Sequence, residues 1–501
     1  MLNVDISVDG DGYENAPPRA ASIVESLRAF GYDLPTALAD LVDNSISAKA
    51  RNIWLRFEWD GANSVIAVTD DGKGMNALEL VDAMRFGSRS PLEKRSISDL
   101  GRFGLGLKTA SLSQCRRLTV RSRSEDGATA TRCWDLDAIA AATNDEWRLL
   151  RSADAPAEKY FEQLAKLRHG TCVLWQQLDR LVNGQQTQNE KHQQRFLARL
   201  EGVRKHLGMV FHRLMTGGDA VRIFVNDRPV EPWDPFMESY LATHALPTDP
   251  LRYDGKLVSV KPVVLPHISK LTKIQYEAGG GPRGWLAHQG FYVYRRDRLL
   301  VAGDWLGFGW TKDEHLKLAR ISIDLPNSLD HDWQIDVTKS KATPPLGLRD
   351  DLRRIAEHTR EVARSVYTHR GAHLTPHAEI KRTHVWEPLA KHDRTFYRIN
   401  REHPLVQQVF SRSTDKQALT ALLNLLQETI PLQHISITST EKPESQPQPF
   451  EGANEGQVLE VMQQLFKSLR ASGCTLEEAR QNLRTHWPFE LFPALLATLN
   501  D

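Results

Sequence analysis

The chain has 501 residues, which is too long for one hydrophobic core, so we expect two to four domains. Apolar residues make up 41%, charged residues 25% and aromatic residues 8%, which excludes a collagen-like chain or one disordered throughout. The formal net charge of +1 excludes a globally basic nucleic-acid-binding protein, so only a local basic patch could serve that role.

The four cysteines are Cys115, Cys133, Cys172 and Cys474, and they stand far apart in the sequence. This spacing argues against a disulfide framework and against a cysteine metal site. Residues 1–18 carry acids and lack the apolar segment of a secretory signal. Because no uninterrupted apolar run reaches membrane-spanning length, we expect a cytoplasmic protein without membrane contact.

Apolar residues at helical spacing predict two helices within residues 18–51. Alternating or short apolar runs then predict four strands, at 54–59, 65–69, 118–123 and 172–176. These elements indicate an α+β domain over residues 1–215. The polar segment 184–195 within it is interpreted as an exposed loop or the start of a helix.

A second α+β domain is predicted over residues 216–347, because strands dominate again. The predicted strands are 221–225, 257–264, 290–301 and 319–325. Residues 348–440 are interpreted as a basic helical region. Residues 441–456, rich in Pro, Glu and Gln, indicate a flexible linker, and residues 457–501 indicate C-terminal helices.

The first polar cluster lies in the second predicted helix, where Asp40 and Asn44 share one helix face. A carboxylate and an amide oxygen on one face can hold a water and a hard cation such as Mg²⁺. A solvated polar helix face is the alternative interpretation.

The second cluster, Asp70-Asp71-Gly72-Lys73-Gly74-Met75, directly follows an apolar strand. Its two glycines allow a tight turn and close backbone approach to a ligand. A carboxylate at a strand end can accept a hydrogen bond from an exocyclic amine such as that of adenine. A simple β-turn would explain the same residues.

The third cluster runs Gly101-Arg102-Phe103-Gly104-Leu105-Gly106-Leu107-Lys108 and opens a predicted helix. Glycines at a helix start expose backbone N–H groups that suit an anion. The cluster is not a Walker motif, since no GK[ST] follows a four-residue gap, and it does not open a βαβ unit as a Rossmann site does. A flexible glycine-rich connection is the alternative.

These three clusters, followed by His169-Gly170-Thr171 before a strand, resemble in their order the GHKL ATPase superfamily. That superfamily includes gyrase B, the MutL proteins, sensor histidine kinases, heat-shock chaperone ATPases and the MORC proteins. The resemblance covers roughly residues 15–345, and ALADLVDNS with FGLGLK looks most like MORC and MutL. It implies a Bergerat ATP-binding sandwich, an S5-like transducer domain and a helical C-terminal region.

The resemblance also implies ATP and Mg²⁺ as ligands. Asn44 would complete the Mg²⁺ shell, Asp70 would bind the adenine amino group, and Thr171 would hydrogen-bond near the adenine. Gly72, Gly74 and Met75 would shape the pocket beside the base. The third cluster would bind the phosphates through Gly101, Gly104 and Gly106, with Arg102, Phe103 and Leu105 between them and Lys108 adding charge. Residues 76–100 would form the ATP lid.

One departure from the family concerns catalysis: Asp40 stands where the family usually has Glu, which orients and deprotonates the attacking water. Asp is one methylene shorter, and a positioning error of about an ångström can cost about a hundredfold in rate. Slow hydrolysis is therefore expected. Ser47 stands where related motifs often have Asp. In the second domain, Lys339 and Lys341 resemble the transducer lysine that reaches the terminal phosphate, and both remain candidates.

The expected function is a nucleotide-gated ATPase that forms homodimers when ATP binds and acts in a DNA-related process such as repair, restriction or phage defence. DNA and proteins of a bacterial defence or repair system are the partners that the resemblance implies. Basic and aromatic residues in 349–401 suit phosphate backbones, but acids mixed among them favour a solvated helix face equally. A chaperone-like ATPase and a non-hydrolysing ATP-binding scaffold are the alternatives.

Overall fold

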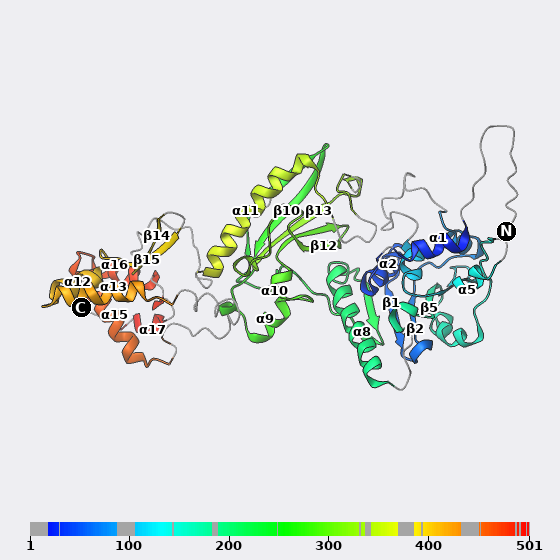
Figure 1. Ribbon diagram of the computed structural model, residues 1–501, viewed down its shortest axis with the longest axis horizontal. Coiled ribbons are helices and arrows are strands. Elements are labelled where there is room, and N and C mark those ends of the chain that lie inside the picture. Colours follow the sequence, from blue (N-terminus) through cyan, green and yellow to red (C-terminus); the bar gives the residue numbers. More distant parts are fainter. Residues whose placement is uncertain are drawn as a thin grey trace. The chain divides into compact units, whose positions relative to one another are not determined.

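The computed structural model divides the chain into two compact units, Met1–Ala372 and His373–Asp501 (Figure 1). The structure describes residues 19–29, 31–87, 106–142, 145–182, 189–247, 249–329, 332–335, 342–368, 385–391, 394–431, 450, 452–485, 488–489, 492–496 and 498–499. In these ranges, no helix combines the length and the apolar character needed to cross a membrane.

The first domain of the N-terminal unit contains a seven-stranded sheet with the order β4-β3-β5-β2-β1-β6-β7. Neighbouring strands are antiparallel, except for the parallel pair β1–β6. The strands are β1 (Asn52–Glu58), β2 (Val65–Asp70), β3 (Arg117–Arg123), β4 (Thr129–Asp135), β5 (Gly170–Gln176), β6 (Arg222–Val225) and β7 (Arg228–Pro229). All four strands predicted for this domain are present, whereas β4 was not predicted.

Successive side chains of a strand point to opposite faces of the sheet, and every residue of β2 is buried. Both faces of the sheet are therefore covered at this strand. Ile66 and Val68 of β2 lie in the main core, whereas Val65 and Ala67 lie in a smaller core on the other face, which the segment Ala155–Phe161 and α6 (Glu162–Lys166) cover. The helices that contribute to the main core include α1 (Ala20–Leu27), α2 (Leu34–Ser47), α4 (Gly106–Leu112) and α8 (Glu190–Val210).

The second domain contains a six-stranded sheet with the order β12-β11-β13-β10-β8, in which β9 also pairs with β10. Its strands are β8 (His244–Ala245), β9 (Asp249–Tyr253), β10 (Lys256–Val264), β11 (Gly290–Arg295), β12 (Arg298–Asp304) and β13 (Ala319–Leu325). The helices are α9 (Lys273–Gly279), α10 (Gly284–Ala287) and α11 (Leu346–Thr368), and α11 packs against β10 and β13 (Figure 1). The predicted strand 290–301 is thus a hairpin.

Two domain boundaries differ from the sequence prediction. Strands β6 and β7 belong to the first sheet, which therefore continues past residue 215, because β6 pairs with β1 far away in the chain. Helix α11, the start of the predicted basic region 348–440, belongs to the second domain. Its apolar face, including Leu352 and Ile355, is buried in the same core as the second sheet.

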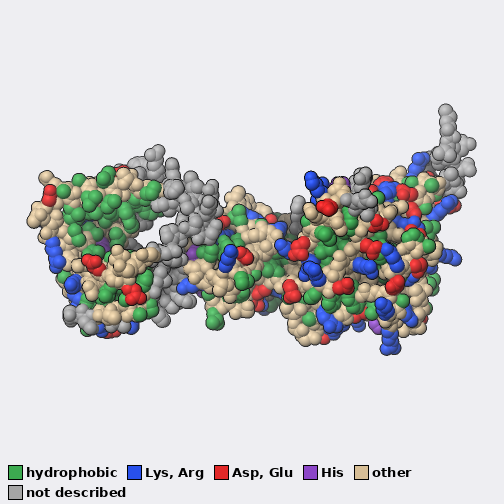
Figure 2. Space-filling model, turned by 90° about the horizontal axis from the view of Figure 1, so that it is seen from below, with side chains coloured by type: hydrophobic (Ala, Val, Ile, Leu, Met, Phe, Trp, Pro, Cys, Tyr) green, Lys and Arg blue, Asp and Glu red, His purple; other side chains and the backbone are tan. Residues whose placement is uncertain are grey.

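The C-terminal unit contains a hairpin and several helices. Its elements are β14 (Trp386–Lys391), β15 (Arg394–Ile399), α12 (Pro404–Arg412), α13 (Lys416–Glu428), α15 (Glu455–Ala471), α16 (Leu476–Thr485) and α17 (Pro493–Leu496). Of these, α15, α16 and α17 contribute to a core of its own. The hairpin shows that the region 348–440 is not purely helical. Of the predicted linker 441–456, only residues 450 and 452–456 are described, and α15 begins within it. Hydrophobic side chains also gather at the surface of this unit (Figure 2). The exposed apolar residues of the unit include Val409, Leu422, Leu425 and Leu426.

Candidate nucleotide site

Helix α2 carries the first cluster. The Asp33 side chain caps it by accepting a hydrogen bond from the Thr36 N–H at 2.8 Å, and a proline in the first turn suits its start. Asp40 is buried with 3% of its surface exposed, whereas Asn44, one turn later, is exposed. The Tyr32 hydroxyl donates to Asp40 Oδ2 at 2.9 Å. The helix therefore presents an exposed amide one turn from a carboxylate that the Tyr32 hydroxyl already contacts.

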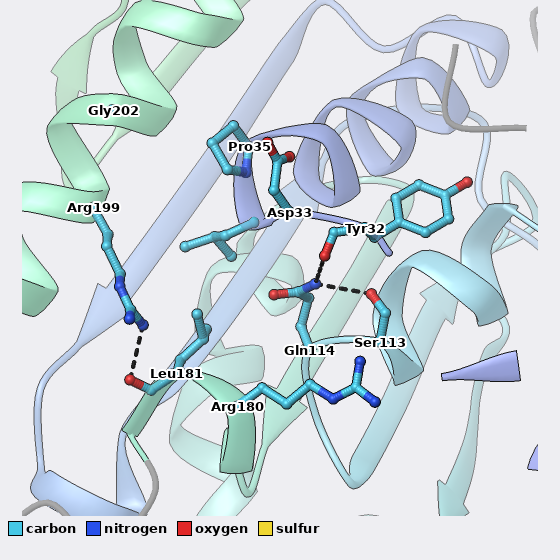
Figure 3. Close-up of a pocket in the computed structure, with 10 residues that line it drawn as sticks. Tyr32, Asp33, Pro35, Ser113, Gln114, Arg180, Leu181, Arg199 and Gly202 are labelled. Carbon is cyan, nitrogen blue, oxygen red and sulfur yellow. Dashed lines mark hydrogen bonds between the residues drawn. The ribbon is translucent and has the colours of Figure 1, made fainter. Parts of the chain in front are cut away.

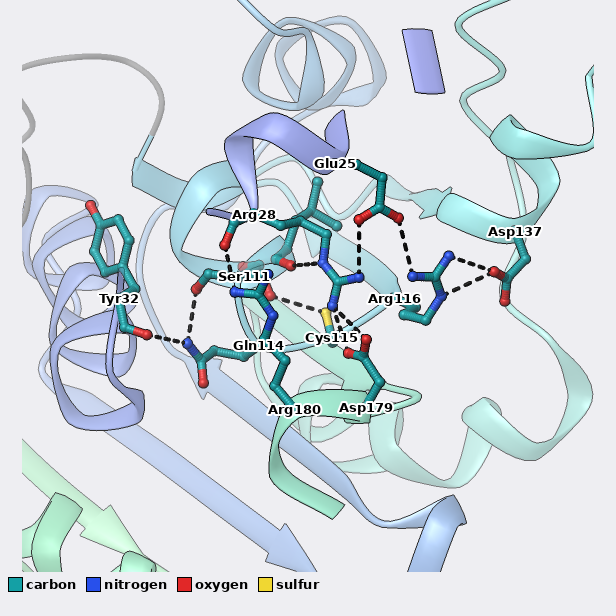
Figure 4. Close-up of polar contacts among 12 residues, drawn as sticks. Glu25, Arg28, Tyr32, Ser111, Gln114, Cys115, Arg116, Asp137, Asp179 and Arg180 are labelled. Atoms are coloured by element: carbon teal, nitrogen blue, oxygen red, sulfur yellow. Dashed lines mark hydrogen bonds and ion pairs between the residues drawn. The ribbon is translucent and has the colours of Figure 1, made fainter. Parts of the chain in front are cut away.

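Helix α4 approaches the same carboxylate with its first residue. A Cβ atom on Gly106 would lie 3.5 Å from Asp40 Oδ2. At the other end of α4, Arg28 donates from Nε to the carbonyl of Leu112 at 2.8 Å and contacts both carboxylate oxygens of Asp179 (Figure 4). A cation at the last carbonyls of a helix is favourable, so these contacts fix α4 with its first turn at Asp40.

The second cluster places Asp70 at the end of β2, with 5% of its surface exposed. Its carboxylate accepts hydrogen bonds from Ser45 Oγ at 2.8 Å and from the Gly72 N–H at 2.9 Å. Burial raises the pKa of the Asp70 carboxyl to about 6, although these hydrogen bonds oppose the shift. Ser45 is the residue after Asn44 on α2. Its hydrogen bond to Asp70 therefore ties the end of β2 to the part of the helix that carries the Asn44 amide.

Thr171 lies directly opposite Asp70 in the pairing of β5 with β2. Its hydroxyl is 2.8 Å from Ser122 Oγ, which also accepts from the Met75 N–H at 2.8 Å. Asp70, Met75 and Thr171 therefore meet at one end of three neighbouring strands, as the resemblance implies. The connecting residues Ser45 and Ser122 were not predicted, because a single serine in a helix or strand carries no distinctive sequence signal.

Two glycines allow the chain segments around Asp70 to approach closely. Gly74 has φ +67°, and a Cβ atom there would lie 1.9 Å from the Arg123 carbonyl oxygen. Gly170 has φ +149°, and its Cβ would lie 2.1 Å from the Asp70 carbonyl oxygen. Only glycine fits either position. His169 Nδ1 lies 2.6 Å from the Gly72 carbonyl oxygen and closes the loop on this side.

Lys108 differs from its expected role at the phosphates. The side chain is buried with 1% of its surface exposed, and its Nζ donates to the carbonyl of Ala83 in α3 (Ala77–Met84) at 2.9 Å. Burial lowers the pKa of the Lys108 ammonium group to about 8. This hydrogen bond connects α3 to α4. The glycine motif does not show that Lys108 lies on the side of α4 that faces α3.

Several predicted site residues lie outside the described residues. Of the proposed lid 76–100, residues 76–87 are described and include α3, which begins with a capping box between Asn76 and Glu79. The residues that no description covers are Gly101, Arg102, Phe103, Gly104, Leu105, Lys339 and Lys341.

A separate pocket of about 380 Å³ lies at the start of α2 (Figure 3). Tyr32, Asp33 and Gln114 line it, and Gln114 Nε2 donates to the Tyr32 carbonyl at 2.9 Å while the Tyr32 ring points away. Asn44 and Asp70 are not among its lining residues. The pocket therefore lies beside the N-terminus of α2 and is distinct from the predicted nucleotide site.

The oxygen atoms of Asn44 and Asp70 suit a magnesium nucleotide. Asn44 offers an exposed amide oxygen, one turn from the Asp40 carboxylate, and oxygen ligands are those that Mg²⁺ prefers. A buried carboxylate at Asp70 is the acceptor that an adenine amine requires. Both halves of such a ligand would find side chains of the right chemistry here.

Comparison with known families agrees with this geometry. Residues 32–171 match the family model described as histidine kinase-, DNA gyrase B- and HSP90-like ATPase. The match begins at Tyr32 and ends at Thr171, so it includes every described residue of the site. This segment is a GHKL ATP-binding domain, which confirms the superfamily predicted from the sequence. No curated protein matches the chain, and the narrower likeness to MORC and MutL stays a prediction.

Proposed function

We propose that the protein binds ATP with Mg²⁺ and hydrolyses it slowly to ADP and phosphate. The observation that carries this proposal is the Asp70 carboxylate, buried at the end of β2 opposite Thr171 and joined through Ser45 to the helix of Asp40 and Asn44. Burying this charge costs free energy of folding even with its hydrogen-bond partners. Recognition of the adenine amino group would explain why a carboxylate stands there.

Each side chain then has one task. Asp70 accepts the hydrogen bond of the adenine amine, and Asn44 holds the cation with its amide oxygen. Mg²⁺, when bound, neutralises phosphate charge. Asp40 orients the attacking water and takes its proton, while the Tyr32 hydroxyl at 2.9 Å keeps the carboxylate from turning. Aspartate reaches less far than glutamate, which accounts for the slow rate.

Turnover of ATP by the whole protein, with and without Asp40→Ala, tests this proposal. The variant should bind Mg·ATP in a calorimetric titration as the unchanged protein does, but lose about 10²–10⁴-fold in hydrolysis, the usual contribution of a general base. Equal turnover by both proteins would place the base elsewhere. Binding without any turnover by the unchanged protein would instead support the non-hydrolysing scaffold.

We also propose, from the resemblance, that ATP closes the lid, brings Lys339 or Lys341 to the terminal phosphate and pairs two copies of the chain. Light scattering with ATP analogue, ADP and no nucleotide tests the pairing. A dimer should form with the analogue, since only its γ-phosphate distinguishes the closed state from the ADP state. The same mass in all three samples would reject it.

A role on DNA is proposed from the resemblance to MORC and MutL alone. Basic residues in and after α11 are the candidates for phosphate contacts. The guanidinium carbons of Arg353 and Arg360 instead lie 5.4 and 4.2 Å from the ring centre of Trp310. Arg354 lies 3.4 Å from Asp351. These contacts favour the helix-face interpretation for this part of α11. Stimulation of turnover by double-stranded DNA that weakens as salt rises would support the DNA role.

A further inference from the structure

An arginine of the second domain reaches the carboxylates of α2. Arg298, the first residue of β12, has a side chain that is 3% exposed. Its Nε lies 3.2 Å from both carboxylate oxygens of Asp43, and its Nη2 lies 4.0 Å from Asp40 Oδ1. Both carboxylates are nearly fully buried. One guanidinium group therefore faces the proposed catalytic carboxylate and its neighbour on the same helix.

The backbone of the second domain fixes Arg298 in this place. The turn between β11 and β12 consists of Arg296 and Asp297, with φ values of 50° and 63°. Positive φ at both residues is typical of the tight two-residue hairpin turn, which sets the pairing of Arg295 with Arg298. The Arg298 guanidinium also lies 5.9 Å from the ring centre of the buried Phe211.

Asp40 is thus held from two sides. Tyr32, just before α2, donates to Oδ2, and the guanidinium of Arg298 faces Oδ1. A general base acts well only when its carboxylate keeps the right orientation, because a shift of about an ångström can cost about a hundredfold in rate. One of the two supports comes from the ATP-binding domain and the other from the second domain.

A second set of contacts holds the second domain against the ATP-binding domain, and we call this boundary the seam. Arg213, just after α8, contacts the Asp324 carboxylate at 2.5 Å and Ser322 Oγ at 2.9 Å, both on β13. Its guanidinium lies 3.5 Å from the ring centre of Tyr294 on β11. Because β11 also leads into the Arg298 turn, these contacts keep Arg298 against α2.

We propose that Arg298 is a positioning residue of the ATPase site: Asp43 holds its guanidinium in place, and the charge of that group orients the Asp40 carboxylate. Hydrolysis then depends on the second domain lying against α2, whereas nucleotide binding does not. A buried ion pair gives little net stability over apolar side chains, so a role in orientation better explains this arrangement. The inference rests on the proposed ATPase function.

The test compares kcat, KM and ADP affinity for the whole protein and its variants. Arg298→Gln should lower kcat about 10- to 100-fold, with ADP affinity in calorimetry changed less than about twofold. Arg298→Lys keeps a cation but lacks the planar guanidinium group. Its kcat should therefore lie between those of the unchanged protein and Arg298→Gln. Arg213→Ala, which loosens the seam without touching α2, should also lower kcat and leave ADP affinity intact.

Arg296→Ala is the matched control, because that side chain is exposed on the same turn, and it should leave all three quantities unchanged. Parent kcat in Arg298→Gln would overturn the inference. So would a matched fall in kcat and ADP affinity in both Arg298 variants, since that indicates a loosened fold. Parent kcat in Arg213→Ala would overturn the dependence on the seam. If the unchanged protein shows no turnover, the proposed function itself fails and this inference fails with it.

Discussion

Asp70 illustrates how function and stability oppose each other at one residue. Its carboxyl has a pKa near 6 in the folded chain, against an ordinary value of 3.8. Between these two values the folded state binds more protons than the unfolded state. Stability therefore falls as pH rises through this window, and above pH 6 the full cost of the buried charge is present, on the order of 3 kcal/mol.

Asp70→Asn should remove this cost. The free energy of unfolding of the nucleotide-free variant should exceed that of the unchanged protein above pH 6, and the gain should shrink towards pH 4. Urea unfolding at a series of pH values measures it. An equal difference at every pH would contradict the burial argument.

The same variant should lose its ligand, because an amide donor would replace the acceptor that faces the adenine amine. An unsatisfied buried pair costs about 1–3 kcal/mol, so ATP affinity should fall about 10- to 100-fold. Asp71→Asn is the control, because the Asp71 carboxylate accepts from the backbone N–H groups of Arg51 and Asn52 and so supports the loop alone. Its ratio of ATP to GTP affinity should not change, whereas that of the Asp70 variant should.

The sequence predicted the residues with local motifs and missed those with distant partners. Asp70 and Thr171 stand in recognisable clusters, and the structure brings them together across paired strands. Arg298, by contrast, is 255 residues from Asp43, and no spacing rule links them. The contact of Lys108 with the Ala83 carbonyl was not predicted, because the motif gives the position of the lysine in the chain but not the side of the helix on which it lies.

Among the elements, the loop after β2 depends most on a glycine. In Gly74→Ala, the new Cβ would overlap the Arg123 carbonyl, and φ would remain in the left-handed region. We expect a loss of more than about 2 kcal/mol in unfolding free energy, together with weaker ATP binding, since Asp70 and Met75 border this loop. Denaturant unfolding and calorimetry measure the two effects.

Gly127→Ala separates strain from overlap. Gly127 also has positive φ, +87°, but nothing lies within 4 Å of its Cβ position. This variant should lose only about 1–2 kcal/mol and keep its ATP affinity. Equal losses in the two variants would show that the close approach to Arg123 does not matter.

Elements with strong periodicity were predicted well, and elements defined by pairing were not. The strands that were predicted, such as β2, β5, β10 and β13, follow alternating or apolar runs, and α11 follows a charged helical pattern that buries one face. The hairpin β14–β15 lies in the region 348–440, which was predicted as a basic helical region. The membership of β6 in the first sheet depends on its partner β1, which hydrophobic patterning along the chain does not show.

At the scale of the whole molecule, the chain contains two units with separate cores. The main core runs from Ala20 to Ala363 and joins the ATP-binding domain to the second domain and α11. The core of the C-terminal unit contains buried residues from Val458 to Leu499. Since each unit buries its own apolar surface, the first should fold without the second.

A chain that ends at residue 372 should therefore keep the ATP affinity and the unfolding midpoint of the first unit. A chain that ends at residue 345 provides the contrast, because it lacks α11 and exposes the sheet surface that Leu352, Ile355 and Ala356 cover. Burial of each large aliphatic side chain contributes about 1.5–3 kcal/mol, so the loss of this helix is comparable with the usual margin of stability of about 5–15 kcal/mol. The shorter chain should unfold or aggregate. Calorimetric unfolding with and without Mg·ATP measures both outcomes, and equal midpoints for the two truncations would show that α11 is not part of the first unit's core.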